Sequence, residues 1–293
     1  MASPVPPSPI PSASGGWRLR LFRAALRAGG TFAPLPTARL VNRWIGTPPR
    51  KPSSPKEAAV LMTARRVPVT TSRGYTVMTY RWGDAGRLVL LQHGWSADSG
   101  RWYQWVEPLL QAGFQVIAID GPAHGESTGE MSGLIAFMDG MAAVAREVGE
   151  VYGAVGHSLG GAAVLYSMAL APRLPLQRAV ILSTYANMID LFEDQAAYMH
   201  MPRRTLNALY REIEKQYAVR VADYNGLVCA PSVATPTLIV HDRADEVVAF
   251  AHGETLASLI PGARLFATEK LGHHLLLRNK EVIREAVGFL AED

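Results

Sequence analysis

The sequence predicts an α/β protein built on an open, mostly parallel sheet of eight strands, flanked by helices. From residue 67 onward, strand-like runs alternate with helix-like runs, and most of the strand-like runs are almost continuously apolar. Such runs are typical of parallel strands that are buried on both faces. With 293 residues and 48% hydrophobic content, the chain is long enough to bury a large core within one catalytic domain.

The expected strands begin with a hairpin that turns at Arg73 and Gly74, and six further runs follow along the chain. The eight expected strands cover 67–72, 75–81, 87–93, 114–120, 151–156, 178–184, 236–241 and 263–268. The expected helices cover 102–112, 133–148, 159–170, 247–260 and 279–291. Helical crossovers between parallel strands place ligand sites at the carboxyl ends of those strands. Candidate functional residues are therefore sought where strands end.

The N-terminal part of the chain differs in composition from the remainder. Residues 1–15 are mostly proline, serine and small residues, and they are expected to be disordered. A secretory signal is not expected here, because the basic residues follow the prolines instead of preceding an apolar run. The next segment predicts an amphipathic helix, with Leu19 and Phe22 on one face and Arg20 and Arg23 on a neighbouring face. This helix either packs on the catalytic domain or contacts a membrane surface or a partner.

Charge and cysteine content exclude several classes of protein. The 29 Lys and Arg residues against 25 Asp and Glu give a net charge of +4, which is too small an excess to indicate nucleic-acid binding. The single cysteine, Cys229, rules out an internal disulfide, and neither a metal nor a cofactor is expected. No apolar window is long enough to span a membrane. A cytoplasmic protein is expected, with peripheral membrane attachment through the basic N-terminal segment as the open alternative.

The segment VYGAVGHSLGGAAVL, residues 151–165, joins an apolar strand to a helix of small residues through several glycines. Residues 156–160 match the G-x-S-x-G nucleophile elbow, a strained turn between strand and helix that exposes a serine hydroxyl. Gly156 and Gly160 leave room at positions where a side chain would collide with neighbouring backbone. The pattern predicts that Ser158 is a catalytic nucleophile.

A serine nucleophile needs a base to remove its proton and an acid to orient that base. Asp242 and Asp245 both follow the seventh expected strand, and His273 and His274 both follow the eighth. The order serine, acid, histidine along the chain is the order found in hydrolases with a nucleophile elbow. Position along the chain leaves both members of each pair as candidates.

These motifs resemble those of the α/β-hydrolase superfamily over residues 65–293. The resemblance implies that Asp245 is the acid and His273 the base, with Asp242 and His274 as the alternatives. It also implies a small helical cap at 186–234, between the sixth and seventh strands, in a connection too long for a bare loop. Residues 16–64 would then form an amphipathic extension and a linker, outside the catalytic domain.

The resemblance also extends to the loop after the third strand, and it implies that the backbone N–H groups of Trp95 and Leu159 hold the oxyanion. The segment DGPAHGES, residues 120–127, resembles a family loop in which the residues at the positions of Asp120, His124 and Gly125 are structural. These three residues are therefore not placed in the site.

Four side chains are expected to contact the substrate: His157 within the elbow, the Trp95 ring, and Met188 and Phe192 in the cap. Methionine adapts to irregular apolar ligands. Packing between the cap and the body is the alternative role for the apolar residues of the cap.

The sequence predicts a serine hydrolase, of carboxylesterase or lipase-like type, that cleaves a small-molecule carboxylic ester through an acyl-enzyme. Thioesterase, lactonase and acyltransferase activities use the same residues and are alternatives. A ligand-binding receptor with vestigial turnover is an alternative from another class. Haloalkane dehalogenases and epoxide hydrolases are disfavoured, because they carry a carboxylate at the elbow position that serine occupies here.

Overall fold

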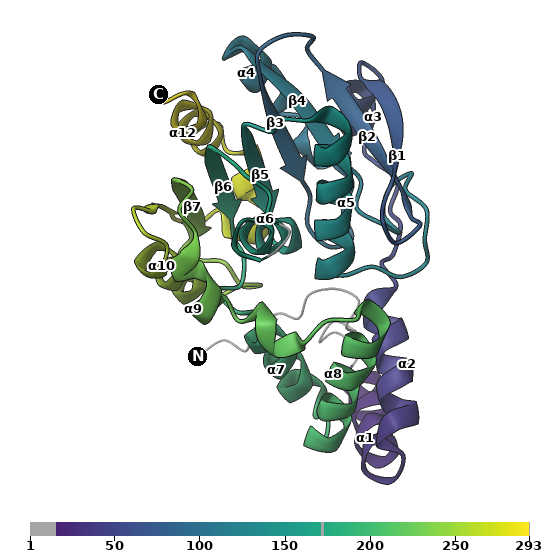
Figure 1. The fold of residues 1–293 in the computed structure, drawn as a ribbon. Coiled ribbons are helices and arrows are strands. Elements are labelled where there is room, and N and C mark those ends of the chain that lie inside the picture. Colours follow the sequence, from purple (N-terminus) through teal and green to yellow (C-terminus); the bar gives the residue numbers. More distant parts are fainter. Residues whose placement is uncertain (1–15, 171–172, 293) are drawn as a thin grey trace.

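The computed structural model describes residues 16–170 and 173–292, so the expectation for residues 1–15 falls outside the described part of the chain. At its centre lies the predicted sheet of eight strands, in the order β1-β2-β4-β3-β5-β6-β7-β8 (Figure 1). The strands are β1 (Arg65–Thr70), β2 (Thr76–Trp82), β3 (Arg87–Gln92), β4 (Phe114–Ile119), β5 (Gly153–His157), β6 (Arg178–Leu182), β7 (Thr237–Asp242) and β8 (Arg264–Thr268). Each coincides with a predicted strand to within about two residues at either end.

The sheet is mostly parallel, as predicted. Strand β3 pairs in parallel with β4 and β5, and the parallel pairing continues through β6 and β7 to β8. Among the described strands only β2 runs in the opposite direction, because it is antiparallel to both of its neighbours, β1 and β4. All five residues of β5 are buried, which explains its continuous apolar character. The carboxyl ends of the parallel strands therefore share one edge of the sheet.

Helices cover both faces of the sheet (Figure 1). On one face lie α5 (Leu134–Val148), α6 (Leu159–Ala169) and α10 (Phe250–Leu259), whose side chains share a buried cluster with the strands. On the other face lie α4 (Val106–Gln111) and α12 (Lys280–Ala291), around the fully buried Trp102 and Trp105. Every residue of α6 after Leu159 is buried. This explains why its sequence is apolar all round instead of amphipathic.

The predicted cap is present between β6 and β7. Its helices are α7 (Met188–Met199), α8 (Arg203–Tyr217) and α9 (Gly226–Cys229). Helix α7 begins at Asn187, whose side-chain oxygen accepts a hydrogen bond from the N–H of Ile189 and so caps the helix. Figure 1 shows α7 and α8 at one end of the molecule, beside α1 and α2.

The N-terminal helical hairpin, α1 (Gly16–Phe32) and α2 (Pro34–Gly46), packs on the cap. Leu26, Ala38 and Val41 of the hairpin form one buried cluster with side chains of the cap: Ala196, Met199, Leu206, Ala208 and Leu209. Gly30 permits the close approach, because a Cβ there would lie 2.4 Å from Thr205 Oγ1 and 2.9 Å from Pro202 Cδ. One face of the predicted amphipathic helix is therefore packed against the cap.

The segment between α2 and β1 is held to the body by hydrogen bonds, which differs from the expected linker. The Arg50 guanidinium donates to the carbonyls of Gly125, Ser127 and Gly129 at 3.0, 2.8 and 3.2 Å. Helix α3 (Pro55–Leu61) follows, and it starts with a capping box between Ser54 and Glu57. The proline-rich segment that indicated a linker is therefore held in one position on the surface of the body.

Packing of the hairpin on the cap can be tested with Leu209→Ala. Leu209 is 1% exposed, so its truncation should lower the free energy of unfolding by about 2–5 kcal/mol in urea denaturation. Leu40→Ala is the matched control, because Leu40 on α2 is 70% exposed and its change should stay within about 0.5 kcal/mol. Equal, small effects of both substitutions would show that the hairpin does not cover α8 in solution.

Candidate active site

Ser158 lies at the junction of β5 and α6 with φ 54° and ψ −119°, a conformation that costs a non-glycine residue about 1–3 kcal/mol. The two glycines of the motif make this turn sterically possible. A Cβ on Gly156 would lie 2.3 Å from the carbonyl oxygen of Gly160, and a Cβ on Gly160 would lie 2.1 Å from that of Gln92. The structure therefore has the strained strand-to-helix turn that the sequence predicts.

Neighbouring strands hold the Ser158 backbone in this conformation. Its N–H donates to the carbonyl of Leu182 at the end of β6, at 2.9 Å. The hydroxyl of Thr184 donates to the Ser158 carbonyl at 2.8 Å. These bonds attach the turn to the loop after β6. Thr184 is a supporting residue that sequence reasoning missed, because no local motif surrounds it.

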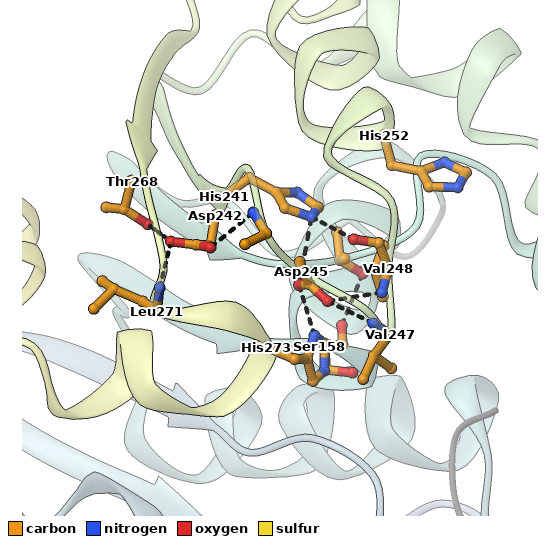
Figure 2. A network of polar contacts seen from close by, with 12 residues as sticks. Ser158, His241, Asp242, Asp245, Val247, Val248, His252, Thr268, Leu271 and His273 are labelled. Atoms are coloured by element: carbon orange, nitrogen blue, oxygen red, sulfur yellow. Dashed lines mark hydrogen bonds and ion pairs between the residues drawn. The ribbon is translucent and has the colours of Figure 1, made fainter. Parts of the chain in front are cut away.

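Asp245 and His273 are hydrogen-bonded, with 2.8 Å between Asp245 Oδ2 and His273 Nδ1 (Figure 2). The other oxygen of Asp245 accepts the N–H groups of Val247 and Val248 at 2.8 and 2.9 Å. Burial alone would raise the pKa of Asp245, but its bond to His273, the histidine charge and these two N–H groups lower the pKa to about 2. Asp245 is thus a carboxylate at neutral pH, and it orients the His273 ring by accepting the Nδ1 proton.

The alternatives Asp242 and His274 occupy other positions. Asp242 accepts hydrogen bonds from the Thr268 hydroxyl at 2.7 Å and from the N–H of Leu271 at 3.0 Å (Figure 2). It ties β7 to the loop that carries His273. His274 is exposed, whereas His273 is buried. The geometry therefore favours Asp245 and His273 as the acid and the base.

Two backbone amides near Ser158 can serve as oxyanion donors. Leu159 is the first residue of α6, so its N–H precedes the intrahelical hydrogen bonds. The loop that carries Trp95 packs against the nucleophile, since a Cβ on Gly94 would lie 3.0 Å from Ser158 Cβ. Within the described part of the chain, neither the Trp95 nor the Leu159 amide has an acceptor. Both are free to bind a developing oxyanion.

The loop before Trp95 is fixed by a buried histidine. His93 Nε2 accepts the N–H of Gly121 at 2.9 Å, so Nδ1 carries the proton and donates to the carbonyl of Gly94 at 2.7 Å. Burial lowers the pKa of His93 to about 4, which keeps this neutral tautomer in place. The next loop is held by Asp120, which accepts the N–H groups of Ser99 and Glu126 at 2.7 and 2.9 Å. Asp120 is structural, as the resemblance implied.

His157 was expected to contact the substrate, but the structure gives it a different position. Its side chain is buried and does not line the pocket beside Ser158. Its Nε2 lies 2.9 Å from the carbonyl oxygen of His273, and the two rings are 4.7 Å apart between centroids. Burial lowers the pKa of His157 well below its ordinary value. His157 therefore connects the elbow to the loop of the predicted base.

A pocket opens beside Ser158, and Trp95, Met188 and Phe192, the residues expected to contact the substrate, are among those that line it. Its empty space, open mouth included, is about 1310 Å³. The apolar lining residues are Ile45, Trp95, Met131, Leu134, Ile135, Leu159, Ala162, Tyr185, Met188, Leu191, Phe192, Ile213, Tyr217, Val219, Val221, Tyr224, Val247 and Val248. The other lining residues are Asn42, Gly46, Ser132, Gly133, Ser158, Thr184, Gln195 and Gln216. None of these residues is charged, so the pocket suits an uncharged, apolar group.

Part of the pocket wall comes from α2, which sequence reasoning placed outside the catalytic domain. Asn42, Ile45 and Gly46 all line the pocket. The Asn42 side-chain amide donates to Gln216 Oε1 on α8 at 2.9 Å, which links the two walls. The sequence predicted an amphipathic helix only in the preceding segment, which forms α1, and it gave no sign that α2 would meet the pocket.

The eight-stranded sheet carries a serine at the turn between β5 and α6. The acid follows β7, and the histidine bonded to it follows β8. This is the architecture of an α/β hydrolase. The alpha/beta hydrolase fold family matches residues 87–231. The chain belongs to the α/β-hydrolase superfamily.

Several relatives align with about three quarters of the chain. The chain is 26% identical over 266 residues to the bifunctional esterase/perhydrolase DCH of Acinetobacter calcoaceticus, an alignment that covers 74% of this chain and 96% of that protein. It is 26% identical to the non-heme haloperoxidase of Rhodococcus erythropolis, over 73% of this chain and 95% of that protein. Among solved structures, an esterase from Exiguobacterium antarcticum superposes with a TM-score of 0.61 at 17% identity, over 78% of this chain and 100% of that chain. These relatives support a hydrolase.

The assignment of the acid can be tested by comparing Asp245→Asn with Asp242→Asn. Asp245→Asn should lower kcat about 10⁴-fold, because the amide no longer stabilises the Nδ1-protonated ring and its charge. Asp242→Asn should leave kcat within about tenfold, but should cost roughly 1–3 kcal/mol of stability through its bonds to Thr268 and Leu271. Ester hydrolysis and urea unfolding measure the two effects. The reverse ranking of kcat would reassign the acid.

The pH dependence of kcat/KM tests His273 as the base. The pKa of Asp245 is lowered to about 2, and burial places the pKa of His157 well below its ordinary value. Log kcat/KM should rise with unit slope and then level off, because only the neutral form of the base accepts the serine proton. His274→Asn should leave this profile unchanged. A second step near neutrality would belong to Asp120, whose pKa burial raises to about 7. A flat profile, with chemistry rate-limiting, contradicts the assignment.

Proposed function

We propose that this protein hydrolyses carboxylic esters with an uncharged, apolar acyl group through a covalent acyl-enzyme. The observation that carries the proposal is the position of Ser158 on the wall of a pocket that has no charged residue. Charged acyl groups would be desolvated there without a partner, whereas aliphatic or aromatic groups gain about 25 cal/mol for each Å² of apolar surface that they bury.

In the first half-reaction, Ser158 Oγ attacks the ester carbonyl while His273 Nε2 takes the hydroxyl proton. Asp245 holds the ring through Nδ1 and stabilises the imidazolium. The N–H groups of Trp95 and Leu159 bind the oxyanion of the tetrahedral intermediate, each worth about 3 kcal/mol. The intermediate then collapses, the bond to the alcohol oxygen breaks, and His273 gives its proton to the departing alkoxide.

In the second half-reaction, water attacks the acyl group on Ser158. His273 removes the proton from this water, and the same two amides hold the second oxyanion. Collapse releases the carboxylic acid and returns the proton to Ser158. The name of the Acinetobacter relative, a bifunctional esterase/perhydrolase, supports ester cleavage on this arrangement of residues.

Turnover of nitrophenyl esters of graded acyl length, beside acyl-thioesters and lactones, tests this proposal. We expect kcat/KM to rise from the acetyl ester to medium-length acyl chains, because each buried methylene contributes about 0.8 kcal/mol. Ser158→Ala should abolish both turnover and labelling by a fluorophosphonate, while circular dichroism and thermal unfolding show an intact fold.

Three outcomes would overturn the proposal in different ways. Faster turnover of thioesters or lactones than of any ester would change the substrate class. Labelling that survives Ser158→Ala would place the nucleophile elsewhere. Slow, single turnover of every ester would favour a ligand-binding receptor.

A further inference from the structure

Helix α1 has a second apolar face that no described residue covers. Leu19 and Leu26 are each 7% exposed, and Leu26 belongs to the buried cluster shared with the cap. Trp17, Leu21 and Phe32 are 64%, 61% and 88% exposed. At 3.6 residues per turn, these three side chains fall on one side of the helix together with the exposed Ala24 and Ala28. We call these five residues the α1 face.

The α1 face is bordered by arginines on both sides. At 100° per residue, Arg18 lies beyond one edge of the face, and Arg20 and Arg27 lie beyond the other. All three are exposed, and none forms an ion pair with another described residue. The two exposed arginines of α2 that do form ion pairs, Arg39 and Arg43, pair with Glu212 and Glu130. Among the exposed arginines of the hairpin, those beside the α1 face are therefore the ones without an ion pair to a described residue.

The charge of the chain is strongly asymmetric. Residues 1–51 contain eight Lys and Arg residues and no Asp or Glu. Because the whole chain carries +4, the remaining residues carry a net charge of −4. A positively charged helix with an exposed apolar face is complementary to a surface that is both anionic and apolar.

We propose that α1 lies in the surface of an anionic lipid bilayer, with the α1 face among the acyl chains and Arg18, Arg20 and Arg27 at the headgroups. An apolar stripe flanked by arginines, with a tryptophan and a phenylalanine at its two ends, is the pattern of a helix that lies in a membrane interface. No helix among the described residues is long and apolar enough to cross a membrane, so the attachment is peripheral.

A second copy of the chain fits this face less well. A symmetric dimer through the α1 face would place its arginines against the same arginines of the partner. The face is also a convex stripe about 26 Å long at 1.5 Å per residue, without the groove that a peptide ligand would need. Anionic lipid satisfies both the arginines and the apolar stripe.

The position of α1 connects the membrane surface to the pocket. Helix α2 follows α1 after a single residue, and it supplies Asn42, Ile45 and Gly46 to the pocket wall. A bilayer that holds α1 is therefore joined by one short helix to the pocket beside Ser158. This link, which rests on the proposed function, makes membrane-dissolved esters accessible substrates. The membrane attachment itself does not depend on it.

Sedimentation of the full chain with vesicles tests the proposal. The probes are phosphatidylcholine vesicles with and without phosphatidylserine. The unaltered protein should sediment with the anionic vesicles, and added salt should weaken this binding because part of it is electrostatic. Combined Trp17→Ser, Leu21→Ser and Phe32→Ser should reduce binding more than tenfold. Combined Arg18→Gln, Arg20→Gln and Arg27→Gln should reduce it by roughly fivefold per arginine and remove the preference for phosphatidylserine.

A matched control removes apolar side chains that are equally exposed elsewhere: Met62→Ser and Val228→Ser, at 84% and 74% exposure, should leave vesicle binding unchanged. All variants should turn over a short soluble ester at the rate of the unaltered protein, which shows an intact fold and site. If no ester is turned over but the substitutions in the α1 face still reduce vesicle binding, the proposed function is wrong and the membrane attachment is supported.

Two results would overturn the attachment. One is vesicle binding that is absent or insensitive to Trp17, Leu21 and Phe32. The other is a dimer, seen by light scattering, that these three substitutions dissociate while the unaltered protein ignores both kinds of vesicle. That dimer would assign the α1 face to a second copy of the chain.

Discussion

The site depends on the close approach of α6 to the end of β3. A Cβ on Gly160 would lie 2.1 Å from the carbonyl oxygen of Gln92 and 2.5 Å from that of His93, so a glycine is needed at this position. The approach brings the start of α6 against the loop that carries Trp95, and it leaves Ser158 in a left-handed, strained turn. Backbone packing thereby places the loop of Trp95 and the start of α6, with the Leu159 amide, beside Ser158. The absence of side chains at Gly156 and Gly160 is what permits this geometry.

The histidine and the acid reach this point through loops that are fixed from several sides. Asp242 ties β7 to the loop before His273, and His157 binds the His273 carbonyl from within the elbow. Asp245 is held by the amides of Val247 and Val248. The ring of His273 therefore has few orientations open to it. Preorganisation of this kind lowers the reorganisation that a charged transition state would otherwise require.

The sequence was most informative where a residue's role depends on its immediate neighbours. The strands were predictable because each apolar run reflects burial on both faces, and Ser158 was predictable because the glycines around it have a local steric cause. The acid and the histidine each had a neighbour of the same type. The family resemblance selected Asp245 and His273, and the hydrogen bond between them favours the same choice. The role of His157 was not predictable, because it depends on a contact with a carbonyl 116 residues away. The pocket wall formed by Ile45 was missed for the same reason.

The pocket wall is assembled from two parts of the chain that are far apart in sequence, since Asn42 of α2 and Gln216 of the cap are separated by 174 residues. The N-terminal hairpin leaves the ribosome long before α8 exists, at roughly 5–20 residues per second. During that interval its buried stripe, with Leu26 and Val41, has no partner. Closing so long a loop is entropically costly unless the intervening sheet has already brought its ends together. The order of synthesis thus delays the pocket wall until α8 has been made, and until then it leaves an apolar, basic hairpin free to contact other surfaces.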